Sequence, residues 1–143
     1  MGQRKDMRAE AVALGAMVQV GTNLGRVLEA STRHAGGIGL TQHYVLSALA
    51  AADPTPLEPR QIAGVIGSGS AHVTMLLDQL VGAGLVERRA HASDRRRREV
   101  VLTDAGRDRV EATTAAMELT ARGILARAPG LGSRDLLAVA AAL

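Results

Sequence analysis

The chain has 143 residues, 47% of them hydrophobic, which is enough for one folded domain with its own core. It contains no cysteine, which excludes disulfides, thiolate metal sites and cysteine-based redox sensing. The formal net charge of +3 is uneven, because residues 60–98 carry +4, residues 1–59 carry 0 and residues 99–143 carry −1. A basic middle third favours a polyanionic partner.

The first predicted element is one long helix over residues 5–34. Gly15, Gly21 and Gly25 are unusual inside it, since each costs ~1 kcal/mol relative to Ala. They indicate either the close approach of a partner helix or ligand, or a locally weak or kinked helix. The helix should stop at residues 35–37, which are Ala-Gly-Gly. Spacings of four and three give a seam suited to a second helix, at Met7, Ala11, Leu14, Val18, Gly21, Gly25 and Leu28.

Three shorter helices are predicted next, over residues 41–52, 59–66 and 71–83. Two prolines after the first of them, a proline opening the second and a glycine closing the third set these limits. The last two helices, joined by a Gly-Ser-Gly-Ser turn, form a helix-turn-helix. The predicted core positions are Val45, Leu46, Leu49, Ile62, Ala63, Ile66, Val73, Leu76, Leu77 and Leu80. The outward-facing side chains of the second helix of this helix-turn-helix are Ser70, His72, Thr74, Met75, Asp78 and Gln79.

Residues 85–103 predict a β-hairpin, because two short runs with apolar ends flank a polar, turn-prone tip. A hairpin rich in arginine is typical of an arm whose guanidinium groups bind phosphates or enter a minor groove of DNA. A solvated, highly charged loop is the alternative, but the position directly after a helix-turn-helix favours DNA. The hairpin carries six arginines, at positions Arg88, Arg89, Arg95, Arg96, Arg97 and Arg98.

The C-terminal part predicts two further helices. Thr103 should cap the first, with Asp104 in its first turn, and Pro129-Gly130 should end it. A last helix is expected over residues 133–143, buried against another surface because apolar residues run to Leu143. The helical stripe of the longer helix is Val110, Thr113, Met117, Ala121 and Ile124.

Between Leu57 and Thr103 the sequence resembles the MarR family of bacterial transcription regulators. That family shares D-x-L-x-x-x-G-L-V-x-R after the helix-turn-helix, then D-R-R in the wing and a closing L-T. The matching residues here are Asp78, Leu80, Gly84, Leu85, Val86, Arg88, Asp94, Arg95, Arg96, Leu102 and Thr103. Residues 38–46 also resemble the family's entry to its second helix. The resemblance covers roughly the whole chain, most closely residues 57–106.

The resemblance implies a mainly α winged helix-turn-helix fold with a small β-hairpin wing. Residues 5–34 and 104–143 would be dimerisation helices, and residues 57–103 the DNA-binding lobe of a single MarR-type domain. It further implies a homodimer on double-stranded DNA, with the recognition helix in a major groove and the wing in a minor groove. Many members repress their own operon until a small aromatic or phenolic effector releases them.

Carried over residue by residue, the resemblance makes Asp94 the wing aspartate that braces an arginine and Arg96 the arginine that enters the minor groove. His72 could contact a base or phosphate, or be an ordinary surface histidine. Gly39 and Gly69 depart from the family pattern. Ser70 and Met75 stand where the family often has basic residues, which leaves the recognition helix nearly uncharged. The predicted DNA-binding residues are Ser70, Ala71, His72, Thr74, Met75, Arg88, Asp94, Arg95, Arg96, Arg97 and Arg98.

Other candidate sites are weaker. His43 and Tyr44 could line an effector pocket, although a core tyrosine with its hydroxyl at the edge is the favoured interpretation. His34 and His43 lack a carboxylate cluster, so no metal or other cofactor is expected, and His91 is expected to be solvated. The sequence has no phosphate-binding glycine loop and no nucleophile elbow, which argues against an enzyme.

The sequence therefore predicts a sequence-specific, ligand-responsive repressor. The alternatives are a winged-helix protein–protein interaction module and a non-specific architectural DNA binder. No apolar run was expected to reach the ~18 residues of a membrane span, and no signal peptide is predicted. A cytoplasmic protein without a membrane partner is the expectation.

Overall fold

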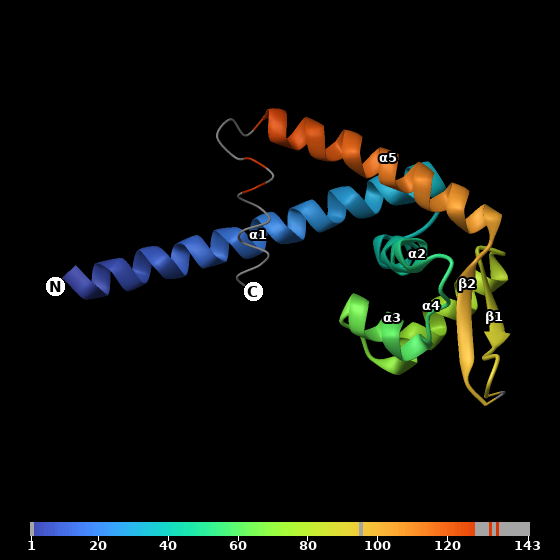
Figure 1. Cartoon of the computed structure of the whole chain (residues 1–143). Coiled ribbons are helices and arrows are strands. Elements are labelled where there is room, and N and C mark those ends of the chain that lie inside the picture. Colours follow the sequence, from blue (N-terminus) through green and yellow to red (C-terminus); the bar gives the residue numbers. More distant parts are fainter. Residues whose placement is uncertain (1, 95, 128–131, 133, 135–143) are drawn as a thin grey trace.

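The computed structural model describes residues 2–94, 96–127, 132 and 134. Two long helices lie side by side and project from a lobe made by the shorter elements between them (Figure 1). The predicted helix over residues 133–143 lies outside the described residues. In chain order the elements are α1 (Gly2–Gly36), α2 (Leu40–Ala52), α3 (Pro59–Ile66), α4 (Ser70–Gly82), β1 (Val86–Ala90), β2 (Arg98–Leu102) and α5 (Asp104–Ala126). This is the predicted winged helix-turn-helix with a two-stranded hairpin.

Helix α1 is continuous through its glycines and slightly longer than predicted. A Cβ atom built at Gly15, Gly21 or Gly25 would meet nothing within 4 Å. Both alternatives, a close partner and a locally weak or kinked helix, therefore stay predictions, and there is room for a close neighbour. The helix ends where Gly37 takes a left-handed φ of 66°, and Arg109 of α5 donates a hydrogen bond to the Gly36 carbonyl.

The lobe has a single apolar core. All predicted inward positions of α2 and α4 are buried, because their spacing keeps one face of each helix against the others. Helix α2 belongs to this core, although the predicted lobe began only at residue 57. The buried hydrophobic residues are Ile38, Val45, Leu46, Leu49, Ile62, Val73, Leu76, Leu77, Leu80, Leu85, Val86, Val100 and Leu102.

A glycine-dependent turn connects the recognition helix α4 to the wing. Gly84 has a φ of 70°, a conformation that costs side-chain-bearing residues energy. Its N–H donates to the Val81 carbonyl at 2.9 Å, and Leu85 N–H donates to the Leu80 carbonyl at 2.9 Å. These two bonds form a Schellman motif, which ends the helix and sends the chain directly into β1.

The wing is an antiparallel pair in which Val86 faces Leu102 and Ala90 faces Arg98. Leu57, just before α3, pairs with Val100 through two backbone hydrogen bonds of 3.1 and 2.8 Å. The inner strand is therefore held on both sides. This fixes the base of the wing against the helix-turn-helix.

Thr103 joins the wing to α5. Its hydroxyl donates to the Gly84 carbonyl at 2.7 Å and accepts the Gly106 N–H at 3.0 Å, which confirms the predicted helix cap. Gly106 is packed so closely that a Cβ there would lie 2.1 Å from the Leu85 carbonyl oxygen. The L-T sequence at the end of the wing thus ties α4, the hairpin and α5 together.

Helix α1 leaves a broad apolar face uncovered. Leu14 and Val18, two of the predicted seam positions, are 63% and 70% exposed, and Val12 is 68% exposed. The side chain of Met7 lies outside the described part. By length and composition alone, the 26 residues Ala11–Gly36 would suffice to cross a membrane, which corrects the expectation that no stretch is long enough.

Candidate nucleic-acid interface

The outward face of α4 is the part of the lobe that the sequence assigned to a major groove. Ser70, Ala71, His72, Thr74 and Met75 are all exposed, as predicted. Met75 keeps 50% of its surface accessible, a large fraction for an apolar side chain. Gly69 is the N-cap and offers no side-chain oxygen to the first turn. Whether these residues touch DNA stays a prediction.

Several polar groups on this face already have partners within the chain. The Thr74 hydroxyl donates to the Ser70 carbonyl at 2.9 Å, so the threonine methyl is its remaining outward feature. Nδ1 of His72 lies 2.7 Å from the Ser68 hydroxyl, which leaves Nε2 for an external partner. The face therefore presents few polar atoms that are still unpaired.

Arg88 connects the wing to the recognition helix. Its guanidinium lies 2.6 Å from the Asp78 carboxylate and donates to the Thr74 carbonyl at 3.3 Å. Both contacts are made to α4, so they fix the angle between strand β1 and that helix. A direct DNA contact by Arg88 remains a prediction, and any such contact would have to share the guanidinium with these partners.

The wing tip contains a turn, as its polar, turn-prone composition predicts. Arg97 N–H donates to the Asp94 carbonyl at 3.0 Å, which closes a turn. The Asp94 carboxylate accepts the backbone N–H of Arg96 at 2.9 Å. The carboxylate therefore holds the backbone of Arg96, and a brace on an arginine side chain stays a prediction. Arg95 lies outside the described residues.

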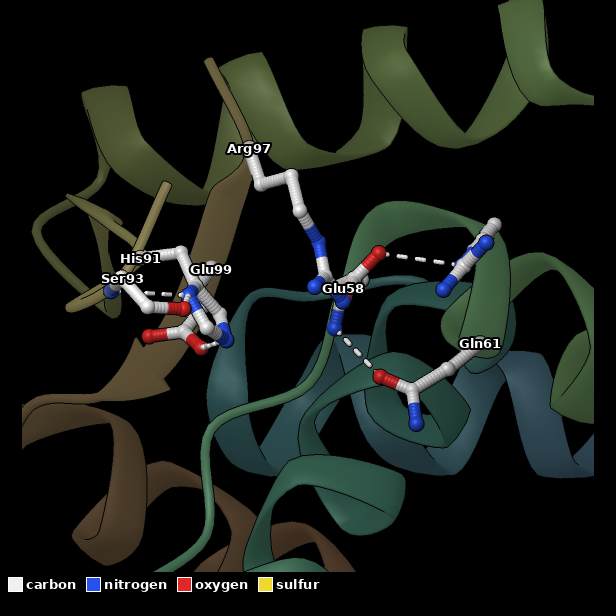
Figure 2. A network of polar contacts seen from close by, with 7 residues as sticks. Glu58, Gln61, His91, Ser93, Arg97 and Glu99 are labelled. Carbon is white, nitrogen blue, oxygen red and sulfur yellow. Dashed lines mark hydrogen bonds and ion pairs between the residues drawn. The ribbon is translucent and has the colours of Figure 1, made fainter. Parts of the chain in front are cut away.

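The wing arginines are not equivalent. Arg97 forms an ion pair with Glu58, the N-cap residue of α3, whose side chain is only 15% exposed (Figure 2). Glu58 also lies 3.0 Å from Arg60. In contrast, Arg96 and Arg98 are exposed and have no ion-pair partner among the described residues. Arg97 thus fastens the wing to the helix-turn-helix, whereas the other two remain available to a polyanion.

Glu58 is a residue that sequence reasoning missed. Its position directly before Pro59 indicated a helix start, but its partner lies 39 positions away, so nothing local predicted the pairing. The expectation that His91 is solvated is also wrong, because its side chain is only 25% exposed. Its Nε2 lies 3.3 Å from the Glu99 carboxylate (Figure 2). Both contacts stabilise the strands below the tip.

A second polar chain links α1 to the recognition helix. The Glu29 carboxylate accepts the Leu40 N–H at 2.5 Å and the Arg33 Nε–H at 2.6 Å. The Leu40 hydrogen bond, followed by Arg33, lowers the pKa of Glu29 despite some desolvation. Glu29 thereby caps α2 where Gly39 has no side chain to do so. Gln42 then donates to the Gln79 amide oxygen on α4 at 2.9 Å.

These residues border a polar cavity of about 350 Å³ between α1, α2 and α4. Its walls are Glu29, Arg33, Gly39, Thr41, Gln42, His72, Leu76 and Gln79. A small molecule held there would touch both a long helix and the recognition helix, so the cavity is placed to connect the two.

A larger cavity of about 640 Å³ lies between α1 and α5. Its walls are almost entirely apolar, and His43 belongs to them. Tyr44 is not among the lining residues and is 45% exposed, so the interpretation as a core tyrosine is wrong. Among the described residues, no group of three metal-ligating side chains occurs.

His43 itself is buried at the junction of α2 and α5. Its Nδ1 lies 2.8 Å from the Thr113 hydroxyl, and its Nε2 lies 3.2 Å from the Ser47 hydroxyl. The Thr113 hydroxyl donates to the Arg109 carbonyl at 2.8 Å, so its lone pair accepts from Nδ1–H, and Nε2 accepts from Ser47. Burial lowers the pKa of His43, which keeps this imidazole neutral.

Known proteins match both the sequence and the fold. A model of the MarR family matches residues 36–97. The fold is similar to that of AbsC, a MarR family transcriptional regulator from Streptomyces coelicolor, with a TM-score of 0.82. The two sequences are 21% identical, and the match covers 94% of this chain and 89% of AbsC. Sco3205 from the same organism, a MarR family transcriptional regulator solved in complex with DNA, gives a TM-score of 0.82 at 18% identity over 92% and 81%.

RV1404 from Mycobacterium tuberculosis gives a TM-score of 0.75 at 26% identity, over 92% of each chain. No curated protein sequence matches this chain. The fold is thus widely represented among solved structures, while the sequence has diverged from each of these relatives.

Proposed function

We propose that this chain, which matches a model of the MarR family over residues 36–97 and shares the fold of MarR family transcription regulators, is a sequence-specific DNA-binding repressor rather than an enzyme. It acts as a homodimer on a pseudo-palindromic operator and is released by a small ligand. The observation that carries the proposal is the exposed face of α4 beside an arginine-rich wing, held at a fixed angle by the Arg88–Asp78 ion pair of 2.6 Å.

Binding would use two kinds of contact. The exposed face of α4 reads base edges in the major groove, and Arg96 and Arg98 meet phosphates or the minor groove. Arg97 is neutralised by Glu58, so it positions the wing and contributes less to the attraction. A protein–protein interaction module does not require exposed arginines in the wing beside α4, whereas a DNA-binding protein does. This favours DNA over that alternative.

The apolar face of α1 supports the homodimer. Its side chains at Leu14 and Val18 are largely exposed in one protomer, and the large cavity between α1 and α5 is open on the same helices. A second copy, with the same face, would cover both. This also accounts for the membrane-like composition of the helix, so we place the protein in the cytoplasm, without a membrane partner.

The ligand response is proposed from the two cavities. The apolar walls between α1 and α5 suit an aromatic or phenolic effector. The effector site therefore includes His43 but not Tyr44. A ligand that moved α1 relative to α5 would move the recognition helix as well, because Glu29 holds the N-terminus of α2, and Gln42 of α2 holds Gln79.

The experiment is a footprint and mobility shift on the DNA that flanks the protein's own gene, over a salt series. We expect two protected half-sites centred about 10 bp apart and much weaker binding to unrelated duplex. Arg98→Ala should lower the salt slope by up to ~1, and the matched variant Arg97→Ala by less. Equal affinity for unrelated duplex would instead identify an architectural binder, and no binding to any duplex would contradict the DNA-binding proposal altogether.

A further inference from the structure

The groove-facing side of α4 has an unusual chemistry for a recognition surface. The helix SAHVTMLLDQLVG contains no lysine and no arginine. Bidentate arginine or lysine contacts to the O6 and N7 atoms of guanine are the most common specific contacts in the major groove. This helix has no side chain that makes such a contact, so its specificity must come from another base feature.

The acidic and amide side chains of α4 are also engaged elsewhere. Asp78, a possible acceptor for cytosine, is held by Arg88 at 2.6 Å. Gln79, the one amide side chain of the helix, would read adenine by using its oxygen and nitrogen together. Its oxygen already accepts from Gln42 at 2.9 Å, which leaves only half of that pair.

What remains exposed at the N-terminal half of α4 is mainly methyl groups. Ala71, Thr74 and Met75 are related by spacings of three and four residues, so they lie on one face of the helix. Thr74 turns its hydroxyl back to the Ser70 carbonyl at 2.9 Å, which leaves its methyl group outward. Met75 adds a flexible thioether chain that is 50% exposed.

The one apolar feature that B-DNA presents in its major groove is the C5-methyl group of thymine. We propose that Ala71, Thr74 and Met75 form a methyl-reading patch that selects thymines in each half-site. This inference rests on the proposed DNA-binding function and names the chemistry that the same site recognises. The operator core is then A·T-rich where α4 enters the groove, and guanines there are poorly discriminated except through the Ser70 hydroxyl and Nε2 of His72.

The test replaces single thymines of the protected sequence by deoxyuridine, which removes the methyl group and keeps the base pair. For the full-length protein, each contacted thymine should cost about three- to fivefold in affinity, the factor expected for one buried methyl group. Deoxyuridine outside the protected half-sites is the DNA control and should change nothing.

Two variants assign the effect to the patch. Thr74→Ser keeps the hydroxyl and removes the methyl, and Met75→Ala shortens an exposed side chain, so both leave the core intact. Each should bring the thymine-to-deoxyuridine affinity ratio at its own contacted position close to one. Val65→Ala, which alters a 64% exposed side chain of α3, is the protein control and should leave every ratio unchanged.

The outcomes separate this inference from the proposed function. If the protein binds its operator but no deoxyuridine substitution weakens it, the methyl-reading patch is wrong and sequence-specific binding stands. If the ratios are unchanged in both Thr74→Ser and Met75→Ala, thymine is read by other residues, and the assignment is wrong. If no duplex is bound at all, the proposed function fails, and this inference fails with it.

Discussion

The lobe between residues 38 and 102 and the pair of long helices beside it differ in how far they bury their apolar side chains. Every buried hydrophobic side chain of the described core lies in the lobe, from Ile38 to Leu102. Helix α1 instead exposes Val12 at 68% and Val18 at 70%. The lobe therefore buries its own apolar side chains within one chain, whereas α1 leaves much of its apolar surface exposed.

The two regions are joined by polar contacts more than by a shared apolar core. Thr103 bonds to Gly84 and Gly106, Arg109 bonds to the end of α1, and His43 bonds to Thr113. Directional hydrogen bonds fix relative orientation more narrowly than apolar contact does. The proposed ligand response needs such a joint, because a change between the long helices would have to reach the recognition helix as a defined movement.

The largest expected effect comes from comparing an apolar side chain in each region. Leu77 is fully buried in the lobe, so Leu77→Ala should lower the free energy of unfolding by about 2–5 kcal/mol at every protein concentration. Leu14 is 63% exposed, and Leu14→Ala should instead weaken self-association, with a loss of stability that grows on dilution. Chemical denaturation at several concentrations measures both. A concentration-independent loss for Leu14→Ala would contradict the proposed role of α1.

The next effect concerns the joint itself. A methyl group at Gly106 would lie 2.1 Å from the Leu85 carbonyl oxygen, and this neighbour is backbone that cannot rotate away. Gly106→Ala should therefore cost about 3 kcal/mol, at the upper end for an overpacked site. Gly123→Ala, in the same helix but with nothing within 4 Å, is the matched control and should gain about 1 kcal/mol. Thermal unfolding of the two variants should move in opposite directions.

The smallest expected effect tests the buried hydrogen bonds of His43. Thr113→Val keeps the shape of the side chain and leaves Nδ1–H of His43 without its acceptor, which should cost about 1–2 kcal/mol. Burial also lowers the pKa of His43, so the unfolded chain binds more protons than the folded one below about pH 6.5. Stability should therefore fall as the pH drops through that window.

The control for this pH dependence is His43→Gln, which has no titrating group at that position. Urea unfolding at pH 7.5 and at pH 5 should show a smaller acid-induced loss for this variant than for the wild type. An unchanged loss would mean that His43 is not the group responsible.

Much of the lobe could be predicted because its causes are local. Apolar spacing placed Val73, Leu76 and Leu77 in the core, and the glycine at position 84 marked both the helix end and the turn into the wing. Thr103 was recognisable as a helix cap from its neighbours alone. The outward residues of α4 followed from the same periodicity, since a helix that buries one face must expose the other.

Only the tertiary structure decided which polar groups meet. Arg97 and Glu58 are 39 residues apart, Glu29 caps α2 from 11 residues away, and Arg109 reaches Gly36 across 73 residues. Sequence periodicity places a side chain on a face, but it does not say which distant face comes to lie opposite. For the same reason, four consecutive arginines could be located in the wing from the sequence alone, but only the fold determined that Arg97 supports the wing while Arg96 and Arg98 remain exposed.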